Sequence, residues 1–125
     1  MTGPILLEYN LDNAQKLKLR FVCAQLKIAV RSVPKTDWKQ PVGALTGACA
    51  RTADVYDGDG FSDEMLVMAN FTNALLHAFL KATQQAKMQT IPLKAVLTPT
   101  NAAWDSVRLH DEIQKEHLAM HGGGK

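Results

Sequence analysis

Polar side chains that could contact a ligand occur where short apolar runs end. Asn10, Asn70 and the group Thr98, Thr100 and Asn101 each follow such a run. In a sheet whose strands are all parallel, these side chains would converge at the carboxyl edge, where open α/β sheets bind small molecules. A small-molecule enzyme with a polar strand-edge pocket would use them in this way. Asparagine is also favoured at turns and helix starts without a ligand, so a structural role at the strand ends is the first expectation.

Two tryptophans form a second group of candidate residues. Trp38 and Trp104 each follow a proline by a few positions, Pro34 and Pro99 respectively. An indole brings a large apolar surface and one N–H donor. We expect these rings to cover two parts of the core, and an equivalent pair would also suit a ligand platform or the contact surface of a symmetric dimer.

The other reactive side chains form no recognisable motif. Cys23 is expected to be an inert core thiol, and Cys49 has no histidine close in the sequence to activate it. The acidic segment Asp54–Glu64 does not follow the calcium-loop pattern and is expected to be a solvated loop. His110 is expected on a solvated face of the last helix. We therefore expect no catalytic residue, no metal site and no cofactor.

Hydrophobic periodicity predicts the elements that must position these residues. Strands are expected over Ile5–Tyr9, Ile28–Val33, Met65–Ala69 and Pro92–Leu97. Helices are expected over residues 14–26, from Thr72 or Asn73 to about Lys87, and after Asn101, with a short one within Pro41–Ala50.

The same order of elements occurs twice at an offset of 60 residues. Residues 8–14 align with residues 68–74, with identical residues at Asn10 and Asn70 and at two further positions. The agreement fits either a duplicated βαβ unit or the same helix-start chemistry used twice. The sequence thus predicts one domain over 1–125, with a first βαβ half over 1–34 and a second half with a C-terminal helix over 65–121. A long connection over 35–64 contains the short helix and the acidic loop.

Two βαβ halves predict an α+β fold. We favour a ferredoxin-like sandwich, in which the halves interlock, the first and third strands lie central and antiparallel, and helices cover one face. The alternative is a small flavodoxin-like α/β fold with a parallel sheet covered on both faces. In the ferredoxin-like arrangement Asn10 and Asn70 lie at opposite ends of the sheet, and the shared polar pocket does not form.

The segment from Pro92 to Asn101, PLKAVLTPTN, followed by Trp104, resembles a short bacterial family known as domain of unknown function 3783. The resemblance extends from about Met65 to His117. The upstream segment Gln40–Gly47 is also similar to the N-terminal part of longer members. The resemblance implies no activity, substrate or catalytic residue.

Composition and charge narrow the classes of function. The chain has 125 residues, of which 46% are hydrophobic and 21% charged, as in globular domains with a packed core. A formal net charge of +2 makes nucleic acid an unlikely partner. The sequence contains neither a secretory signal nor an apolar run of membrane-spanning length, so a cytoplasmic location is expected.

Three functions remain open on the sequence. The first is a non-enzymatic binding, regulatory or assembly module that forms a homodimer and contacts an unknown small molecule or protein. The second is the small-molecule enzyme described above. The third is a weak RNA-binding module that uses the basic stripe of Lys16, Arg20 and Lys27, which is a poor case for base stacking.

Overall fold

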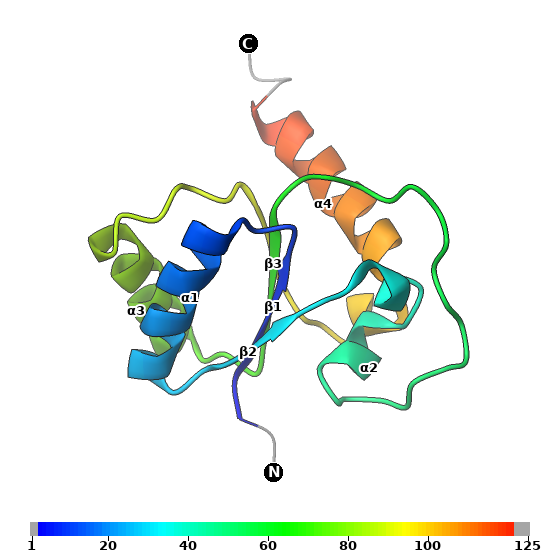
Figure 1. The fold of residues 1–125 in the computed structure, drawn as a ribbon, viewed down its shortest axis with the longest axis horizontal. Helices are drawn as coiled ribbons and strands as arrows, with labels where there is room; N and C mark the ends of the chain where they lie inside the picture. Colours follow the sequence, from blue (N-terminus) through cyan, green and yellow to red (C-terminus); the bar gives the residue numbers. More distant parts are fainter. Residues whose placement is uncertain (1–2, 122–125) are drawn as a thin grey trace.

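The computed structural model describes residues 3–121 as a four-stranded sheet with four α-helices and two 3-10 turns (Figure 1). The strands are β1 (Ile5–Tyr9), β2 (Ala29–Ser32), β3 (Met65–Ala69) and β4 (Leu93–Val96). The helices are α1 (Asn13–Leu26), α2 (Val42–Leu45), α3 (Asn73–Gln85) and α4 (Ser106–His121), with the 3-10 turns η1 (Lys35–Asp37) and η2 (Asn101–Ala103). The predicted strands and long helices are all present. The helix expected within residues 41–50 has four residues, and Gly47 adopts a left-handed φ of 86° shortly after its end.

The sheet is mixed and has the strand order β2-β1-β3-β4. β1 is parallel to β2 and β3 is parallel to β4, whereas the central strands β1 and β3 are antiparallel. The α+β class is therefore confirmed, and the parallel flavodoxin-like alternative is wrong. The central antiparallel pair is as predicted, but the halves stand side by side instead of interlocking. In each half the two strands pair with each other, so the helix between them connects neighbouring parallel strands.

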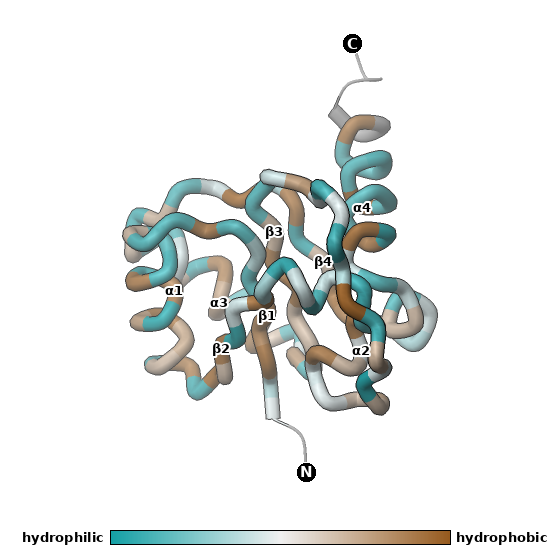
Figure 2. Tube along the Cα trace, turned by 45° about the vertical axis from the view of Figure 1, so that its right-hand side comes forward, coloured by the Kyte–Doolittle hydropathy of each residue, from teal (hydrophilic) through white to brown (hydrophobic). Residues whose placement is uncertain are grey.

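Helices cover both faces of the sheet. In Figure 1, α1 and α3 lie on one side of the sheet, and α2 and α4 lie on the other. The expectation that helices cover one face is wrong, because the central strands are apolar on both faces. In β1, Leu6 packs in the core beneath α1 and α3, while Leu7 and Tyr9 pack in a second core on the opposite face. Figure 2 shows these apolar strands at the centre of the molecule.

The two halves share local geometry at the offset of 60 residues. Asn10 and Asn70 follow the central strands with φ of 66° and 63°, and Lys27 and Lys87 follow the first helices with φ of 59° and 60°. Asparagine tolerates this left-handed region better than most residues. The chain therefore makes the same strand-to-helix and helix-to-strand turns twice.

The helix starts repeat as well. The Asp12 carboxylate accepts a hydrogen bond from the Gln15 N–H at 2.8 Å, and the Thr72 hydroxyl accepts one from the Leu75 N–H at 3.0 Å. Each is an N-cap contact, in which the side chain of one residue accepts from the backbone N–H three residues later. Since 72 and 75 are 12 and 15 advanced by 60, the caps obey the same offset as the turns.

The pairing of the central strands is symmetric about one residue pair. Leu7 pairs with Val67, which is also its equivalent at the offset of 60. A rotation that exchanges the halves must therefore pass between these two residues. The flanking pairs are exchanged by the same rotation, namely Ile5 with Ala69 and Tyr9 with Met65.

The repeat continues beyond the outer strands. In each half a 3-10 turn leads to a tryptophan and then to a helix, α2 after Trp38 and α4 after Trp104. The Val42 N–H donates to the Trp104 carbonyl at 2.8 Å, and the Ser106 N–H donates to the Trp38 carbonyl at 3.0 Å. The halves thus start each other's last helix, although α2 has 4 residues and α4 has 16.

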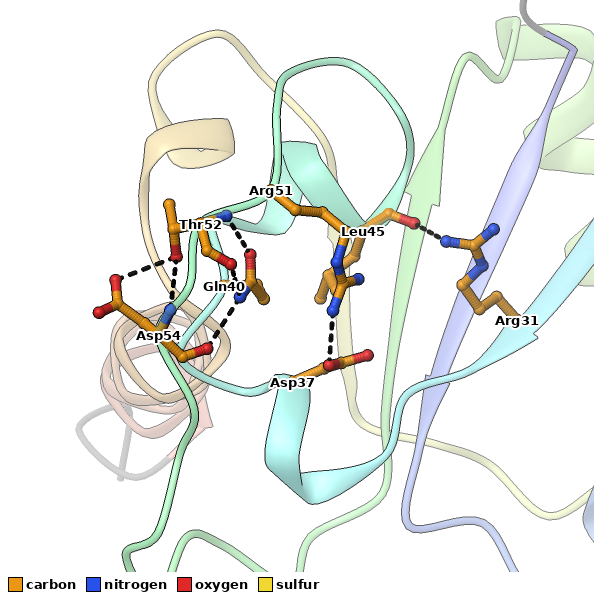
Figure 3. A network of polar contacts seen from close by, with 7 residues as sticks. All are labelled: Arg31, Asp37, Gln40, Leu45, Arg51, Thr52 and Asp54. Atoms are coloured by element: carbon orange, nitrogen blue, oxygen red, sulfur yellow. Dashed lines mark hydrogen bonds and ion pairs between the residues drawn. The ribbon is translucent and has the colours of Figure 1, made fainter.

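The connection between α2 and β3 is tied to the first half by a buried glutamine. The Gln40 amide donates to the carbonyls of Thr52 and Asp54 at 2.8 Å each, and its side-chain oxygen accepts from the Thr52 N–H at 2.8 Å (Figure 3). Arg51 adds an ion pair to Asp37 at 2.7 Å.

Within residues 3–121, no helix combines the length and the apolar character that crossing a membrane requires.

Candidate functional site: a groove between strand β4 and helix α4

A groove of about 350 Å³ runs between the outer edge of β4 and helix α4. Figure 2 shows these two elements side by side. The strand side of the groove is formed by Lys94, Ala95 and Val96. The helix side is formed by residues on successive turns of one helix face: Leu109, Glu112, Ile113 and Glu116. The loop that joins the two sides contributes Thr98, Thr100, Asn101 and Trp104.

The strand side of the groove includes one small side chain, that of Ala95. Ala95 packs against the core on the α4 side of the sheet. Its equivalent in the first half is Arg31, because Leu7 pairs with Arg31 as Val67 pairs with Ala95. The Arg31 guanidinium donates to the Leu45 carbonyl at the end of α2 at 2.9 Å (Figure 3). The corresponding space between β2 and α2 is therefore bridged by a side chain.

The strand side of the groove presents backbone groups. β4 is an edge strand, and its Leu97 N–H donates inward to the Met68 carbonyl at 2.8 Å. Backbone groups alternate in direction along a strand, so those of Lys94 and Val96 point away from β3. The Val96 carbonyl accepts from the Asn101 amide at 3.1 Å, which agrees with this outward direction.

The polar residues of the joining loop hold the loop itself. The Asn101 side-chain oxygen accepts from the Thr98 N–H at 2.8 Å, and the Thr98 hydroxyl accepts from the Asn101 N–H at 3.1 Å. Trp104 also lines the groove, with the Arg108 guanidinium 4.6 Å from its ring centre. Such a cation over an indole face is attracted by the ring electrons. Four of the seven residues predicted to form a ligand site or interface are thus brought together.

The helix side of the groove is acidic. Glu112 and Glu116 both line it, and Glu112 makes an exposed ion pair with Lys115 at 3.6 Å. The third charged residue of the lining, Lys94, has its ammonium hydrogen-bonded to the Ile91 carbonyl. The net charge of the lining side chains is negative, which favours a cationic group as ligand.

Asn10 and Asn70 do not belong to this groove. β1 and β3 are antiparallel, so the two asparagines lie at opposite ends of the sheet, and the shared pocket that a parallel sheet would allow does not form. The Asn10 amide donates to the carbonyls of Phe61 and Asp63 at 2.9 and 3.0 Å, and the Asn70 amide donates to the Gly3 carbonyl at 3.2 Å. Each amide thus ties down the segment that leads into the other central strand. The structural role expected for these amides agrees with these bonds.

Trp38 lies in the core and is only 2% exposed, whereas Trp104 is half-buried. The Trp38 ring stacks on Phe61 with ring centres 4.2 Å apart and also contacts Tyr9 and Tyr56. Its indole N–H is buried and has no hydrogen-bond partner among the described residues. The two tryptophans therefore share a place in the repeat but differ in exposure, and of the two Trp104 contributes to the groove.

His110 is buried, which the sequence pattern did not predict. The ring is 5% exposed and stacks on Phe61 with centres 4.0 Å apart, so its expected place on a solvated helix face is wrong. Nε2 lies 2.8 Å from an Asp63 carboxylate oxygen, and Nδ1 lies 3.1 Å from one of Asp111. Both ring nitrogens are engaged, so His110 cross-links the acidic connection to α4.

Glu8 is a second buried polar residue without a sequence motif. It is 2% exposed at the end of β1, accepts a hydrogen bond from the Ser32 hydroxyl and lies 3.8 Å from the Lys16 ammonium. The only available signal was one charge inside the apolar run Ile5–Tyr9. These two contacts compensate a buried carboxylate that would otherwise destabilise the strand.

The two cysteines differ in environment. Cys23 lies on the buried side of α1, and desolvation raises the pKa of its thiol to about 12. Cys49 is exposed. The inert thiol expected at Cys23 agrees with its burial.

Comparison with known proteins adds one match. Residues 64–120 match the family model described as a domain of unknown function (DUF3783), which confirms the resemblance in the C-terminal half. This segment contains β3, α3, β4 and α4, and hence the whole lining of the groove. The comparisons with curated proteins and with solved structures found no match.

Proposed function

We propose that the groove, which lies entirely within the segment that matches the DUF3783 family model, binds an extended segment of a protein partner. The chain then acts as a non-enzymatic binding and assembly module. The segment adds a fifth strand to the sheet along β4, in the mode known as β-augmentation. The observation that carries the proposal is that a free strand edge and one face of a helix line the same groove.

Backbone contacts supply the affinity in this mode. The outward N–H and carbonyl of Lys94 and the outward N–H of Val96 are the groups with which an added strand pairs. An unprotected sheet edge is otherwise a site of unwanted pairing, which proteins usually block. In the first half the Arg31 side chain bridges the space between β2 and α2. Ala95 leaves the corresponding space free in the second half.

Side chains of the groove supply the selectivity. Alternate residues of the added strand face α4, where Leu109 and Ile113 offer apolar contact and Glu112 and Glu116 offer carboxylates. The preferred segment therefore carries a lysine or arginine beside an apolar residue two positions away. Trp104 also lines the groove and offers the segment an aromatic contact.

The proposal is tested by selecting binders from a displayed library of random nine-residue peptides. We expect enrichment of segments with one basic residue at a fixed position and slowed hydrogen exchange at the Lys94 and Val96 amides in the complex. Ala95→Arg copies the residue that bridges the first half and should weaken binding at least tenfold. Val96→Pro removes an outward N–H without removing a bond to β3 and should do the same.

A pair of charge variants separates a specific acidic wall from net charge. Glu112→Lys together with Glu116→Lys should weaken binding of the selected peptides at least tenfold. Asp57→Lys together with Asp59→Lys makes the same change in net charge on the exposed connection and should leave binding unchanged. Selected peptides that bind all four variants equally, or that perturb α1 and α3 instead of β4, would overturn the proposal.

A homodimer is a second candidate for the assembly role, and exposed apolar residues on α1 favour it. Leu17 and Phe21 are 68% and 63% exposed and lie one helical turn apart. Adjacent exposed apolar side chains of this size are typical of contact surfaces. This surface lies on the face of the sheet opposite to α4, so both contacts can exist together.

A further inference from the structure

The loop between α3 and β4 is where the second half departs from the first. After Lys27 strand β2 begins two residues later, whereas after Lys87 strand β4 begins six residues later. The second half thus contains four additional residues at this point. They follow the end of α3 in the yellow segment of Figure 1.

The longer loop forms one wall of a cavity of about 240 Å³ between α3 and the sheet. Leu66, Phe79 and Ile91 supply apolar surface, and each of them is buried. At about 240 Å³ the cavity lies just below the usual range of pockets for drug-sized ligands. Its size therefore suits a small molecule with a short apolar body.

Polar residues of the cavity stand where the first half has apolar ones. Lys94 occupies the place of Val30, because Leu66 pairs with Lys94 as Leu6 pairs with Val30. At the helix offset of 60, Thr83 replaces Cys23. Gln84 likewise replaces Ala24. At these three positions the first half therefore has apolar side chains. The second half has side chains with hydrogen-bond donors at the same positions.

Lys94 is the one charged residue among those that line the cavity. Its ammonium donates to the Ile91 carbonyl of the additional loop, which leaves further N–H groups for a ligand. Desolvation lowers the pKa of Lys94 from its ordinary value. An anion beside the ammonium would offset the cost of that desolvation.

We propose that this cavity binds a small carboxylate with a short apolar body. The carboxylate accepts from the Lys94 ammonium and the Gln84 amide, and the body packs on Leu66, Phe79 and Ile91. The site lies on the α3 face of the sheet and shares Lys94 with the β4–α4 groove, where the backbone of Lys94, and not its ammonium, is proposed to pair with a peptide.

Titration of the ¹⁵N-labelled chain with sodium hexanoate tests this proposal, with hexan-1-ol as the neutral probe of equal length. Hexanoate should shift the amide signals of residues 88–91 and of the last turn of α3, and should bind at least tenfold more tightly than the alcohol. Lys94→Met should remove that preference, and Lys94→Arg should retain it. Lys81→Met changes an exposed lysine of α3 and is the matched control.

Two outcomes would overturn the carboxylate site. One is equal binding of acid and alcohol to the unaltered chain, which would indicate an apolar cavity without anion selectivity. The other is the absence of shifts at residues 88–91 at millimolar hexanoate. Should Lys94→Met not fold, Lys94→Gln removes the charge and keeps a donor for Ile91. Library peptides bound at β4 are measured separately, so either proposal can fail without the other.

Discussion

Asn10 and Asn70 combine a backbone conformation with a long-range contact. Each has a positive φ, and each amide binds the chain segment that enters the other central strand. The bonds at Asp63 and Gly3 are themselves related by the offset of 60. These residues therefore fix the ends of the β1–β3 pairing as well as the turns into α1 and α3.

Replacement of Asn70 separates the two contributions. Asn70→Ala loses the bond to Gly3 and places a less tolerant residue at φ 63°, and we expect a loss of about 2 kcal/mol in the free energy of unfolding. Asn70→Gly loses the same bond but fits the backbone, and should cost about 1 kcal/mol less than alanine. Urea unfolding measures both. Equal costs for the two variants would show that the left-handed conformation contributes nothing.

The thiols give a prediction about reactivity. Burial raises the pKa of Cys23 to about 12, so below that pH the folded chain holds it as a protonated, shielded thiol. Cys49 is exposed. At pH 8 we expect Ellman's reagent to modify one thiol per native chain, with the second reacting at least about a hundredfold more slowly until denaturant is added.

Single substitutions show which cysteine reacts fast in the native chain and which reacts slowly. Cys49→Ser should abolish the native reaction, and Cys23→Ser should leave it intact. Fast modification of two thiols in the folded chain would contradict the burial of Cys23.

At the scale of elements, helix α1 exposes two large apolar side chains. α1 carries Leu17 and Phe21 on its outer face next to Lys18 and Arg20, which are also exposed. If two copies pair through this face, their like charges oppose the apolar contact. Salt screens that repulsion, so the dimer should strengthen as ionic strength rises.

Light scattering across micromolar concentrations measures this association. Leu17→Ser together with Phe21→Ser should yield a monomer with unfolding free energy changed by no more than about 0.5 kcal/mol, since both side chains are exposed. Val55→Ser removes another exposed apolar side chain and should leave the dimer intact. A strict monomer at all concentrations and salt levels would remove the homodimer and leave the groove proposal unaffected.

At the scale of the whole molecule, local features were predictable and long-range partners were not. The runs ending at Tyr9 and Ala69 predicted the central strands, because short and nearly continuous apolar runs mark a strand buried on both faces. Their antiparallel pairing was one of two arrangements that the sequence allowed. The offset between Asn10 and Asn70 was visible in the sequence, but the rotation that relates them required the register at Leu7 and Val67.

The residues of the candidate site likewise divide into those that the sequence predicted and those that it did not. Thr98, Thr100, Asn101 and Trp104 were accessible to prediction because they follow a strand directly in the sequence. Glu112 and Ala95 were not, since their relation depends on how α4 packs against β4. His110 was assigned to the wrong environment because Phe61, which covers its ring, lies about fifty residues away in the chain.

The difference between Arg31 and Ala95 has a consequence for assembly. A sheet whose two outer strands both accepted partners would propagate, since each addition would expose a new acceptor. Here the space between the outer strand and its helix is bridged by Arg31 in the first half and is left open beside α4 in the second. Under the proposed strand addition, we therefore expect an incoming strand to pair with β4 in preference to β2, which would end a strand-paired assembly after one addition.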